Sequence, residues 1–348
     1  MKAVVLTGIR QLEVRRIDEP VIKSDTEVLV KVASVGLCGS DVHYYETGRI
    51  GSQVVEYPFV VGHECAGVVK EVGSAVTRVK PGNRVAVEPA ISCFECDQCL
   101  AGRPNTCRNL KFISCPNEAE GALCEYIVMP ERNCYKISDK TTFEQASIAE
   151  PLSIGVYTVR TCPALADAAI GILGTGPIGL SVLLAANVAK AGRIYVTDKI
   201  DARLKAAQNL GVTWAGNPDN VDIVEKIIGD GSALEPNGLD VVFECCGRQE
   251  ALDQALDLLK PGGQLVIVGI PKEQRIWFDV DSFRRKELSI RYIRRQNFCV
   301  QPALDLLESG GVNVDFMITH RFGLEQANEA FDLVSGYRDG VIKAMISL

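Results

Sequence analysis

The chain has 348 residues, a net charge of −7 and a hydrophobic fraction of 47%. This length suggests two domains, and an acidic balance without a basic cluster argues against a nucleic-acid partner. The N-terminus, MKAVVLTGIRQLEVRR, carries charges too early for the apolar core of a signal peptide, so we expect a cytoplasmic protein. In that compartment the 13 cysteines fit metal ligands and buried thiols better than disulfides.

The first 90 or so residues are predicted to be rich in strands and turns. Valine recurs at every second position in Val28–Ala33, and Cys65–Val72 is similarly rich in valine. The turn Pro81–Asn83 precedes another predicted strand, Arg84–Val87. Frequent short strands of this kind predict a barrel or a sandwich.

Two segments of this region carry dispersed candidate metal ligands. Cys38 is followed by Ser40 and His43, and the pair His63 and Glu64 begins 25 residues after the cysteine. A thiolate, an imidazole and a carboxylate can hold a catalytic zinc that keeps its fourth position open. From spacing alone, a buried cysteine and a core histidine explain the pattern better. The scarcity of histidine supports the zinc hypothesis, because two of the only three histidines in the chain fall in these segments.

Four closely spaced cysteines form the strongest single motif, C-x2-C-x2-C-x7-C. Thiolates at this spacing on one loop suit a tetrahedral zinc, whereas the alternative is a loop that is merely rich in cysteine. Because protein ligands would fill all four positions, this zinc would be structural. The motif consists of Cys93, Cys96, Cys99 and Cys107.

The run from Ala168 to Ala189 has no charged side chain and is long enough to suggest a membrane span. Its glycines divide it instead into a strand at about Ile170–Leu173, a turn and a helix that begins near Ile178. This order of elements is typical of the dinucleotide-binding motif G-x-G-x-x-G, and a buried strand–helix unit without a ligand is the alternative. The motif places Gly174, Gly176, Pro177, Ile178 and Gly179 at the pyrophosphate of a dinucleotide.

The next predicted strand, Arg193–Thr197, leads to Asp198 at about the spacing expected for the acid that binds ribose. A carboxylate accepts hydrogen bonds from a 2′-hydroxyl and repels a 2′-phosphate, so NAD is favoured over NADP. Lys199 and Arg203 weaken this inference, because nearby cations offset part of the repulsion.

Later elements continue the alternation of strands and helices, which predicts a parallel sheet with helices on both faces. They are a strand at Leu239–Phe243, a helix at Gln249–Lys260, a turn at Pro261–Gly263 and a strand at Gln264–Gly269.

Along essentially its whole length the sequence resembles the medium-chain, zinc-dependent alcohol dehydrogenases, and among them the sorbitol (L-iditol) and other polyol dehydrogenases. The resemblance implies an α/β chain with a β-rich, GroES-like catalytic domain (1–152 and 292–348) and a doubly wound Rossmann domain (153–291). The active site would lie in the cleft between them, and the enzyme would be a homodimer or a homotetramer. The motifs that carry the resemblance are Cys38–Tyr44, Gly62–Glu64, the four-cysteine loop, Glu150–Ser153, the glycine turn and Asp198.

The resemblance also implies the first ligands of the catalytic zinc. Cys38, His63 and Glu64 would be its ligands or near neighbours, with water at the open position. Glu150 would be a further ligand of this zinc, directly or through water. It also indicates the substrate class, because a cysteine looks to be the third ligand in members acting on simple alcohols, whereas Glu-Pro-Leu-Ser looks like the polyol branch. Its apolar neighbours argue against a solvated glutamate. A carboxylate is a harder ligand than the thiolate that it replaces, and it suits a substrate that approaches with two hydroxyls.

Further roles follow from the resemblance alone. Arg294 matches a substrate-binding arginine, but the chain reads Arg294-Arg295 where an arginine–tyrosine pair is usual. This pair either is a solvated charged edge or favours a phosphorylated polyol. The other matches are Ser40 and His43 as a proton relay, Tyr44 and Phe112 as walls of the substrate pocket, and Arg203, Val268, Gly269 and Ile270 as cofactor contacts. The alternative for His43 is a surface histidine, with zinc-bound water and Glu64 or Glu150 moving the proton, and the alternative for Tyr44 and Phe112 is a place in the apolar core.

The sequence therefore predicts zinc-dependent oxidation of a secondary hydroxyl of a sugar alcohol to a ketose, with hydride transfer to NAD. Sorbitol, xylitol, iditol and galactitol are the candidate substrates, and neither nucleic acid nor a membrane is an expected partner. The alternatives within the superfamily are a zinc alcohol, threonine or polyol-phosphate dehydrogenase. The alternative outside catalysis is a structural or regulatory protein that binds NAD.

Overall fold

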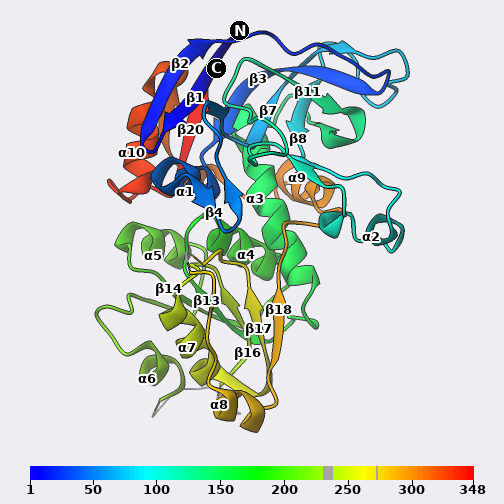
Figure 1. Cartoon of the computed structure of the whole chain (residues 1–348). Coiled ribbons are helices and arrows are strands. Elements are labelled where there is room, and N and C mark those ends of the chain that lie inside the picture. Colours follow the sequence, from blue (N-terminus) through cyan, green and yellow to red (C-terminus); the bar gives the residue numbers. More distant parts are fainter. Residues whose placement is uncertain (230–237, 272) are drawn as a thin grey trace. The chain divides into compact units, whose positions relative to one another are not determined.

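Residues 1–229, 238–271 and 273–348 are described by the computed structural model (Figure 1). They form two compact units: unit 1 comprises Met1–Glu150 and Val300–Leu348, and unit 2 comprises Pro151–Cys299. The division falls inside helix α3 (Phe143–Arg160), directly before the proline in that helix. The domain limits expected from the sequence, 152 and 291, compare with 150 and 299 in the structure.

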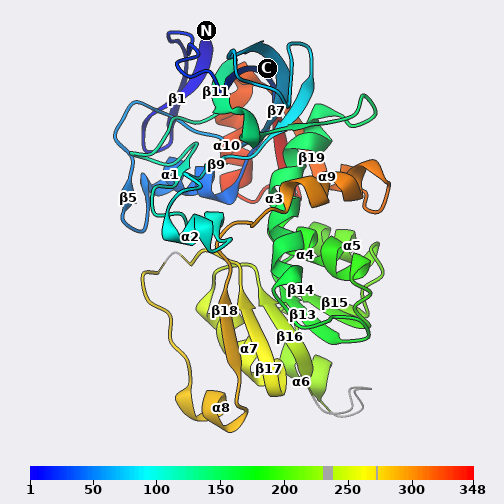
Figure 2. The ribbon, with the colours of Figure 1, turned by 90° about the vertical axis from the view of Figure 1, so that its right-hand side faces the viewer.

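The described part of unit 2 contains a six-stranded parallel sheet in the order β15-β14-β13-β16-β17-β18, and Figure 2 shows these strands side by side. The chain order reverses between β13 and β16, so their carboxyl ends form the switch point at which such sheets bind ligands. This topology confirms the predicted doubly wound sheet. The strands are β13 (Ala169–Leu173), β14 (Arg193–Thr197), β15 (Trp214–Gly216), β16 (Leu239–Glu244), β17 (Leu259–Ile267) and β18 (Ser289–Tyr292).

The charge-free run forms two elements of unit 2. Its first part is β13, all five residues of which are buried, and its second part is α4 (Pro177–Val188), which begins with proline at the first helical position. Within the described residues, no helix has the length and apolar character needed to cross a membrane. The other helices of this unit are α5 (Asp201–Gln208), α6 (Ile223–Ile228), α7 (Gln249–Leu258) and α8 (Val280–Arg285).

Strand β17 differs from the prediction. It begins five residues earlier than expected, at Leu259 rather than Gln264, and ends at Ile267. The predicted turn Pro261–Gly263 therefore lies within the strand. The pairing with β16 is irregular here, because Leu239 faces Leu259 whereas Val241 faces Gln264. Pairing with the neighbouring strand thus extends β17 across a segment whose proline and glycines indicate a turn locally.

Unit 1 is built from strands, as the sequence predicts. Its larger described sheet has the order β12-β8-β7-β3-β20-β19, with β11 also paired to β3, and a second sheet has the order β2-β1-β6. The strands of the first sheet are β12 (Cys134–Lys136), β8 (Arg84–Val87), β7 (Glu64–Val72), β3 (Glu27–Gly36), β20 (Lys343–Ser347), β19 (Ile318–Gly323) and β11 (Tyr126–Pro130). The remaining strands are β1 (Lys2–Gly8), β2 (Gln11–Arg16), β6 (Phe59–Val60), and the short pairs β4 (Arg49–Ile50) with β5 (Gln53–Val54) and β9 (Ala90–Ile91) with β10 (Lys111–Phe112).

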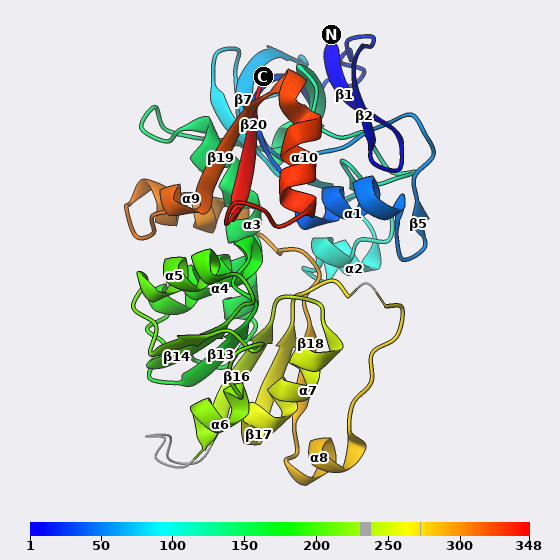
Figure 3. The same cartoon turned by 90° about the vertical axis from the view of Figure 1, so that its left-hand side faces the viewer.

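The C-terminal strand completes the larger sheet of unit 1. β20 pairs antiparallel with β3 and parallel with β19, and Figure 3 shows it beside β19 and α10. Three of its five residues, Ala344, Met345 and Ile346, are fully buried apolar residues of this sheet. The helices of unit 1 besides α3 are α1 (Gly39–Thr47), α2 (Asp97–Leu100), α9 (Val300–Glu308) and α10 (Ala327–Ser335).

Candidate zinc and cofactor sites

The four cysteines of the C-x2-C-x2-C-x7-C motif lie together in unit 1, with their sulfur atoms within 4.8 Å of one another. The Sγ atoms of Cys93 and Cys107 are 3.4 Å apart, and those of Cys96 and Cys107 are 3.9 Å apart. A tetrahedral zinc with bonds of about 2.3 Å separates its sulfur ligands by about 3.8 Å. The cluster thus has the dimensions of a zinc site with four cysteine ligands.

Backbone N–H groups support negative charge on this cluster. Two of them, from Cys93 and Asn109, donate to Cys107 Sγ, each over 3.3 Å. Hydrogen bonds from the backbone of Arg108 and Cys99 lower the pKa of Cys96 to about 6. Zinc requires thiolates, and these donors favour that form at Cys96, whereas burial and the neighbouring thiol groups raise the pKa of Cys99 to about 12.

The second predicted group also comes together in unit 1. Ligand atoms of Cys38, His63 and Glu64 lie within 4.8 Å of one another. Cys38 caps the N-terminus of α1, and the other two residues lie at the start of β7. His63 and Glu64 are 4% and 1% exposed, so a charge bound here would be shielded from solvent. Sulfur, nitrogen and oxygen donors at this spacing fit a zinc ion with an open position.

Asp41 orients this group, a role that the sequence analysis did not assign. Its Oδ1 lies 3.3 Å from His63 Nδ1, and it accepts hydrogen bonds from Ser114 Oγ at 2.6 Å and Gly62 N at 3.0 Å. Its Oδ2 accepts from Cys38 N at 3.3 Å. Engaging Nδ1 leaves Nε2 of the histidine for a metal, as is usual for histidine ligands of zinc.

Burial alone would lower the pKa of His63, but the charges of Asp41 and Cys38 raise it well above its ordinary value. Burial would likewise raise the pKa of Asp41, which His63, Ser114 and Gly62 together lower. Both pKa shifts follow from the close contact between the Asp41 carboxylate and the His63 ring.

Lys343 is a second residue that the sequence analysis missed. Its Nζ donates to both oxygens of Glu64, over 2.6 and 2.8 Å, and to the carbonyl oxygen of Leu37 over 3.0 Å. Both side chains of the ion pair are 1% exposed. Burial lowers the pKa of Lys343, but Glu64 and Cys38 more than offset this and raise it. The lysine in the apolar stretch VIKAMISL was the available sequence signal.

The remaining predicted residues of unit 1 lie on α1, β10 and α3. Among the described residues, the close group of three ligands does not include Glu150, which is 7% exposed on α3 and acts on the charge of Lys343. The ring of Phe112 packs against that of His63, with centroids 5.1 Å apart. Ser40 and His43 are half-buried on α1, in the helix that Cys38 caps.

Tyr44 is buried on the same helix and points its hydroxyl into unit 1. The hydroxyl donates to Gln53 Oε1 over 3.3 Å and lies 4.0 Å from Cys115 Sγ. Burial, with the nearby Cys115, raises its pKa above the ordinary range. Tyr44 is thus a neutral hydroxyl with a fixed partner.

In unit 2 the glycine turn follows the carboxyl end of β13, as predicted. Gly174 N donates to Thr197 O over 2.8 Å, which ties the turn to β14. A side chain at Gly179 would overlap with the carbonyl oxygen of Gly174, so only glycine allows α4 to approach the turn this closely. Pro177 and Ile178 open α4, whose N-terminal N–H groups are suited to a pyrophosphate.

Asp198 lies at the carboxyl end of β14 and braces the same turn. Its Oδ2 accepts from Thr175 N at 2.8 Å and Thr175 Oγ1 at 3.2 Å, and its Oδ1 accepts from Ile200 N at 2.9 Å. Arg203 is 9% exposed on α5, with its guanidinium beside Gly176. The structure thus brings the predicted acid and the predicted phosphate turn together.

Val268, Gly269 and Ile270 follow the end of β17, and the N–H groups of the first two donate to Glu244 O over 2.8 and 3.0 Å. The Glu244 side chain accepts from the next turn, at Gly247 N over 2.6 Å. Ile270 is 54% exposed. Arg294 is exposed beyond the end of β18 in the same unit.

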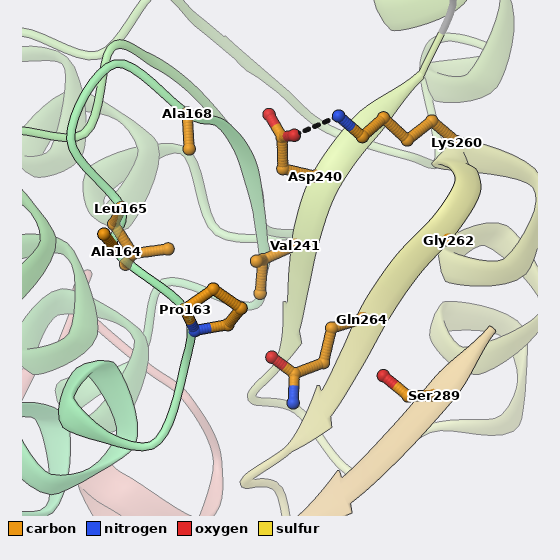
Figure 4. A pocket seen from close by; sticks show the side chains of 10 residues that line it. All are labelled: Pro163, Ala164, Leu165, Ala168, Asp240, Val241, Lys260, Gly262, Gln264 and Ser289. Carbon is orange, nitrogen blue, oxygen red and sulfur yellow. Dashed lines mark ion pairs between the residues drawn. The ribbon is translucent and has the colours of Figure 1, made fainter.

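A hollow of about 340 Å³ in unit 2 lies elsewhere (Figure 4). It is at the amino ends of the strands, where Asp240 pairs with Lys260, whereas the glycine turn follows a carboxyl end. It therefore is not the dinucleotide site. Its lining residues are Pro163, Ala164, Leu165, Ala168, Asp240, Val241, Lys260, Gly262, Gln264 and Ser289.

Comparisons with known proteins agree with this arrangement. Residues 24–139 match the alcohol dehydrogenase GroES-like domain, and residues 177–309 match the zinc-binding dehydrogenase family. A sorbitol dehydrogenase from Bacillus subtilis is 37% identical over 346 residues, which cover 99% of this chain and 97% of that protein.

Two solved structures share the fold over 100% of this chain and 99% of their own. One is a zinc-binding dehydrogenase from Sinorhizobium meliloti bound to NADP, with a TM-score of 0.90 and 32% identity. The other is a short chain alcohol dehydrogenase from E. coli complexed with NADH, with a TM-score of 0.89 and 28% identity. The expected fold class, zinc and a nicotinamide cofactor are confirmed. The chain therefore belongs to the zinc-binding dehydrogenases, which oxidise CH–OH groups, and within them to the branch of sorbitol and other polyol dehydrogenases.

Proposed function

We propose that this chain oxidises a secondary hydroxyl of a free sugar alcohol, with Cys38, His63 and Glu64 as the residues that hold the catalytic zinc. The single observation that carries the proposal is the convergence of these three ligand atoms within 4.8 Å. Zinc bound there supplies a Lewis acid that lowers the pKa of the substrate hydroxyl. Glu150, the residue typical of the polyol branch, is the proposed neighbour that selects a substrate with two adjacent hydroxyls.

The protein groups around this site have separate proposed tasks. Asp41 keeps the histidine ring oriented, because its Oδ1 lies 3.3 Å from His63 Nδ1. Ser40 and His43 pass the hydroxyl proton toward solvent, and both are half-buried at the start of α1. Phe112, in ring contact with His63, excludes water from the apolar side of the substrate. Tyr44 shapes the pocket wall, and Arg294 is a proposed polar contact of the substrate.

Unit 2 binds the dinucleotide that accepts the hydride. The turn Gly174–Gly179 and the N-terminus of α4 receive the pyrophosphate, with Arg203 beside Gly176 as a further phosphate contact. Val268, Gly269 and Ile270 support the nicotinamide end. We also propose that the protein is cytoplasmic and forms a homodimer or a homotetramer. The oligomer is supported by β18, an edge strand of the described sheet whose four residues are all exposed, because an exposed edge can pair with a second copy.

The experiment that tests this proposal follows NADH formation on sorbitol, xylitol, L-iditol, galactitol, their phosphates, threonine and ethanol. Turnover on a free polyol is expected, with about two zinc ions per chain, one for each proposed site. Light scattering on the same sample gives the oligomeric state. Turnover on threonine or ethanol alone would contradict the substrate class, and NADH binding without turnover and with about one zinc would remove the catalytic site.

Asp198 is expected to decide between NAD and NADP, since similar structures hold either cofactor. Asp198→Ala removes the acceptor for the ribose hydroxyls and the repulsion of a 2′-phosphate. We expect the ratio of kcat/KM for NAD over that for NADP to fall at least about tenfold, the value of one hydrogen bond to a charged group. Asp281→Ala removes an exposed acid of the same unit, paired with Arg284 and Arg285 on α8, and should leave the ratio unchanged. An unchanged ratio in Asp198→Ala would remove this residue from cofactor selection.

A further inference from the structure

Lys343 is a buried cation that the proposed reaction does not yet use. Among the described residues it is the only lysine that is buried, with 1% exposure. Its ammonium holds both oxygens of Glu64 and the carbonyl oxygen of Leu37, the residue before Cys38. One side chain therefore connects both segments that carry the proposed zinc ligands.

The fold makes room for this contact at several positions. Leu37 N donates to Ala344 O over 3.0 Å, which fixes β20 beside the segment that leads to Cys38. Gly36 pairs with Glu64 across the sheet, and a Cβ at this glycine would lie 2.5 Å from Glu64 Oε2 and 3.5 Å from Lys343 Cδ. A larger residue there would displace the ion pair. Gly36 thus leaves room for the ion pair between Lys343 and Glu64, and β20 holds the lysine beside it.

We propose that Lys343 is a positioning residue of the catalytic site, which holds the Glu64 carboxylate and balances one negative charge of the zinc ligands. This inference rests on the proposed zinc site. The charged groups that act on Lys343 are Glu64, Cys38 and Glu150, all of them acidic. Two or three anionic groups around one zinc ion would cancel its charge, and Lewis acidity falls as that charge is cancelled. The positive charge of the ammonium offsets part of the negative charge of the ligands, so zinc bound there would remain a stronger Lewis acid. The ammonium also competes with zinc for the Glu64 carboxylate.

A purely structural ion pair would behave differently. Buried ion pairs contribute little net stability, because desolvation offsets their attraction, whereas removing one partner leaves an uncompensated charge. A structural role therefore predicts that losing Lys343 weakens the fold and the metal site together. The positioning role predicts that zinc stays bound, or binds more tightly, while catalysis suffers.

The test uses the full zinc-loaded enzyme and the variant Lys343→Met. The pH at which kcat/KM for a polyol reaches half its maximum should rise by about two units, as Coulomb's law gives for the loss of one charge about 6 Å away at an effective dielectric constant of about 20. Zinc should be removed by a chelator no faster than from the wild type. Lys343→Arg should restore the pH profile, and Lys2→Met, which breaks the exposed pair with Glu325, should change neither quantity.

Replacing Glu64, which carries the negative charge of the ion pair, gives a second pair of variants. Glu64→Gln removes the charge of this proposed ligand but leaves an amide oxygen for zinc, so the zinc-loaded variant should have a lower pH midpoint. Glu64→Gln combined with Lys343→Met should return the midpoint to within about half a unit of the wild type, since the net charge is then restored. The double variant lacks both buried charges, so the comparison with Glu64→Gln remains available if Lys343→Met does not fold.

An unchanged pH midpoint in Lys343→Met, or faster zinc loss with the midpoint unmoved, would overturn the positioning role. Failure of the proposed function would be seen in a different measurement, the zinc content of Cys38→Ser. If Cys38→Ser retained both zinc ions, the zinc site itself would be wrong, whatever the lysine variants do. If Cys38→Ser lost one zinc and Lys343→Met shifted nothing, only the role of Lys343 would fall.

Discussion

Cys38→Ser is expected to abolish polyol oxidation while NADH binding remains unchanged. A serine hydroxyl is a poor zinc ligand, so the catalytic zinc is lost from the site that Cys38 shares with His63 and Glu64. Lewis-acid activation accounts for several kcal/mol of transition-state stabilisation, and turnover should fall at least about a thousandfold. NADH formation measures the loss, and zinc analysis should fall from about two ions per chain to about one.

Cys124→Ser is the matched control for this variant. Cys124 is also a buried thiol of unit 1, 3% exposed, and its sulfur donates to the carbonyl oxygens of Gly121 and Tyr126. A serine hydroxyl can donate to one of these carbonyl oxygens, and Cys124 is not one of the proposed zinc ligands, so activity and zinc content should stay near the wild-type values. Near-normal turnover of Cys38→Ser would contradict the catalytic-zinc assignment.

The parts of both proposed sites that the structure brings together as expected are local in sequence. The four cysteines span one loop, and the structure brings their sulfur atoms together as the spacing predicts. Strand β13, the glycine turn and α4 are consecutive, and β14 has the predicted bounds Arg193–Thr197. Such patterns can be read without the fold, because neighbouring residues decide the geometry.

The parts that were missed depend on contacts across the chain. Lys343 reaches Glu64 over a separation of 279 residues, and Ser114 reaches Asp41 over 73. Neither contact can be predicted from sequence spacing. Lys343 comes near Glu64 because β20 pairs with β3, and that strand order is a property of the whole unit. Charge inside an apolar stretch was a usable signal for the lysine, whereas Ser114 offered none.

Glu150→Ala is expected to remove most polyol turnover while the fold is kept. Glu150 is 7% exposed on α3, between the fully buried residues Ala149 and Leu152 and next to Pro151. A carboxylate in this position adds negative charge beside the proposed zinc group, because it already acts on Lys343. Loss of a group that orients the substrate or relays a proton lowers kcat/KM by about a hundredfold. Thermal unfolding of the zinc-loaded protein checks the fold.

Two further variants separate the role of charge from that of packing. Glu144→Ala removes a carboxylate of the same helix that pairs with Arg321, and should leave kcat/KM unchanged. Glu150→Gln keeps the shape without the charge. If Gln is as inactive as Ala, the negative charge of Glu150 is what the polyol requires, and if Gln is active, hydrogen bonding suffices. Full activity of Glu150→Ala would move the choice of substrate to other residues and favour the alcohol or threonine dehydrogenase alternative.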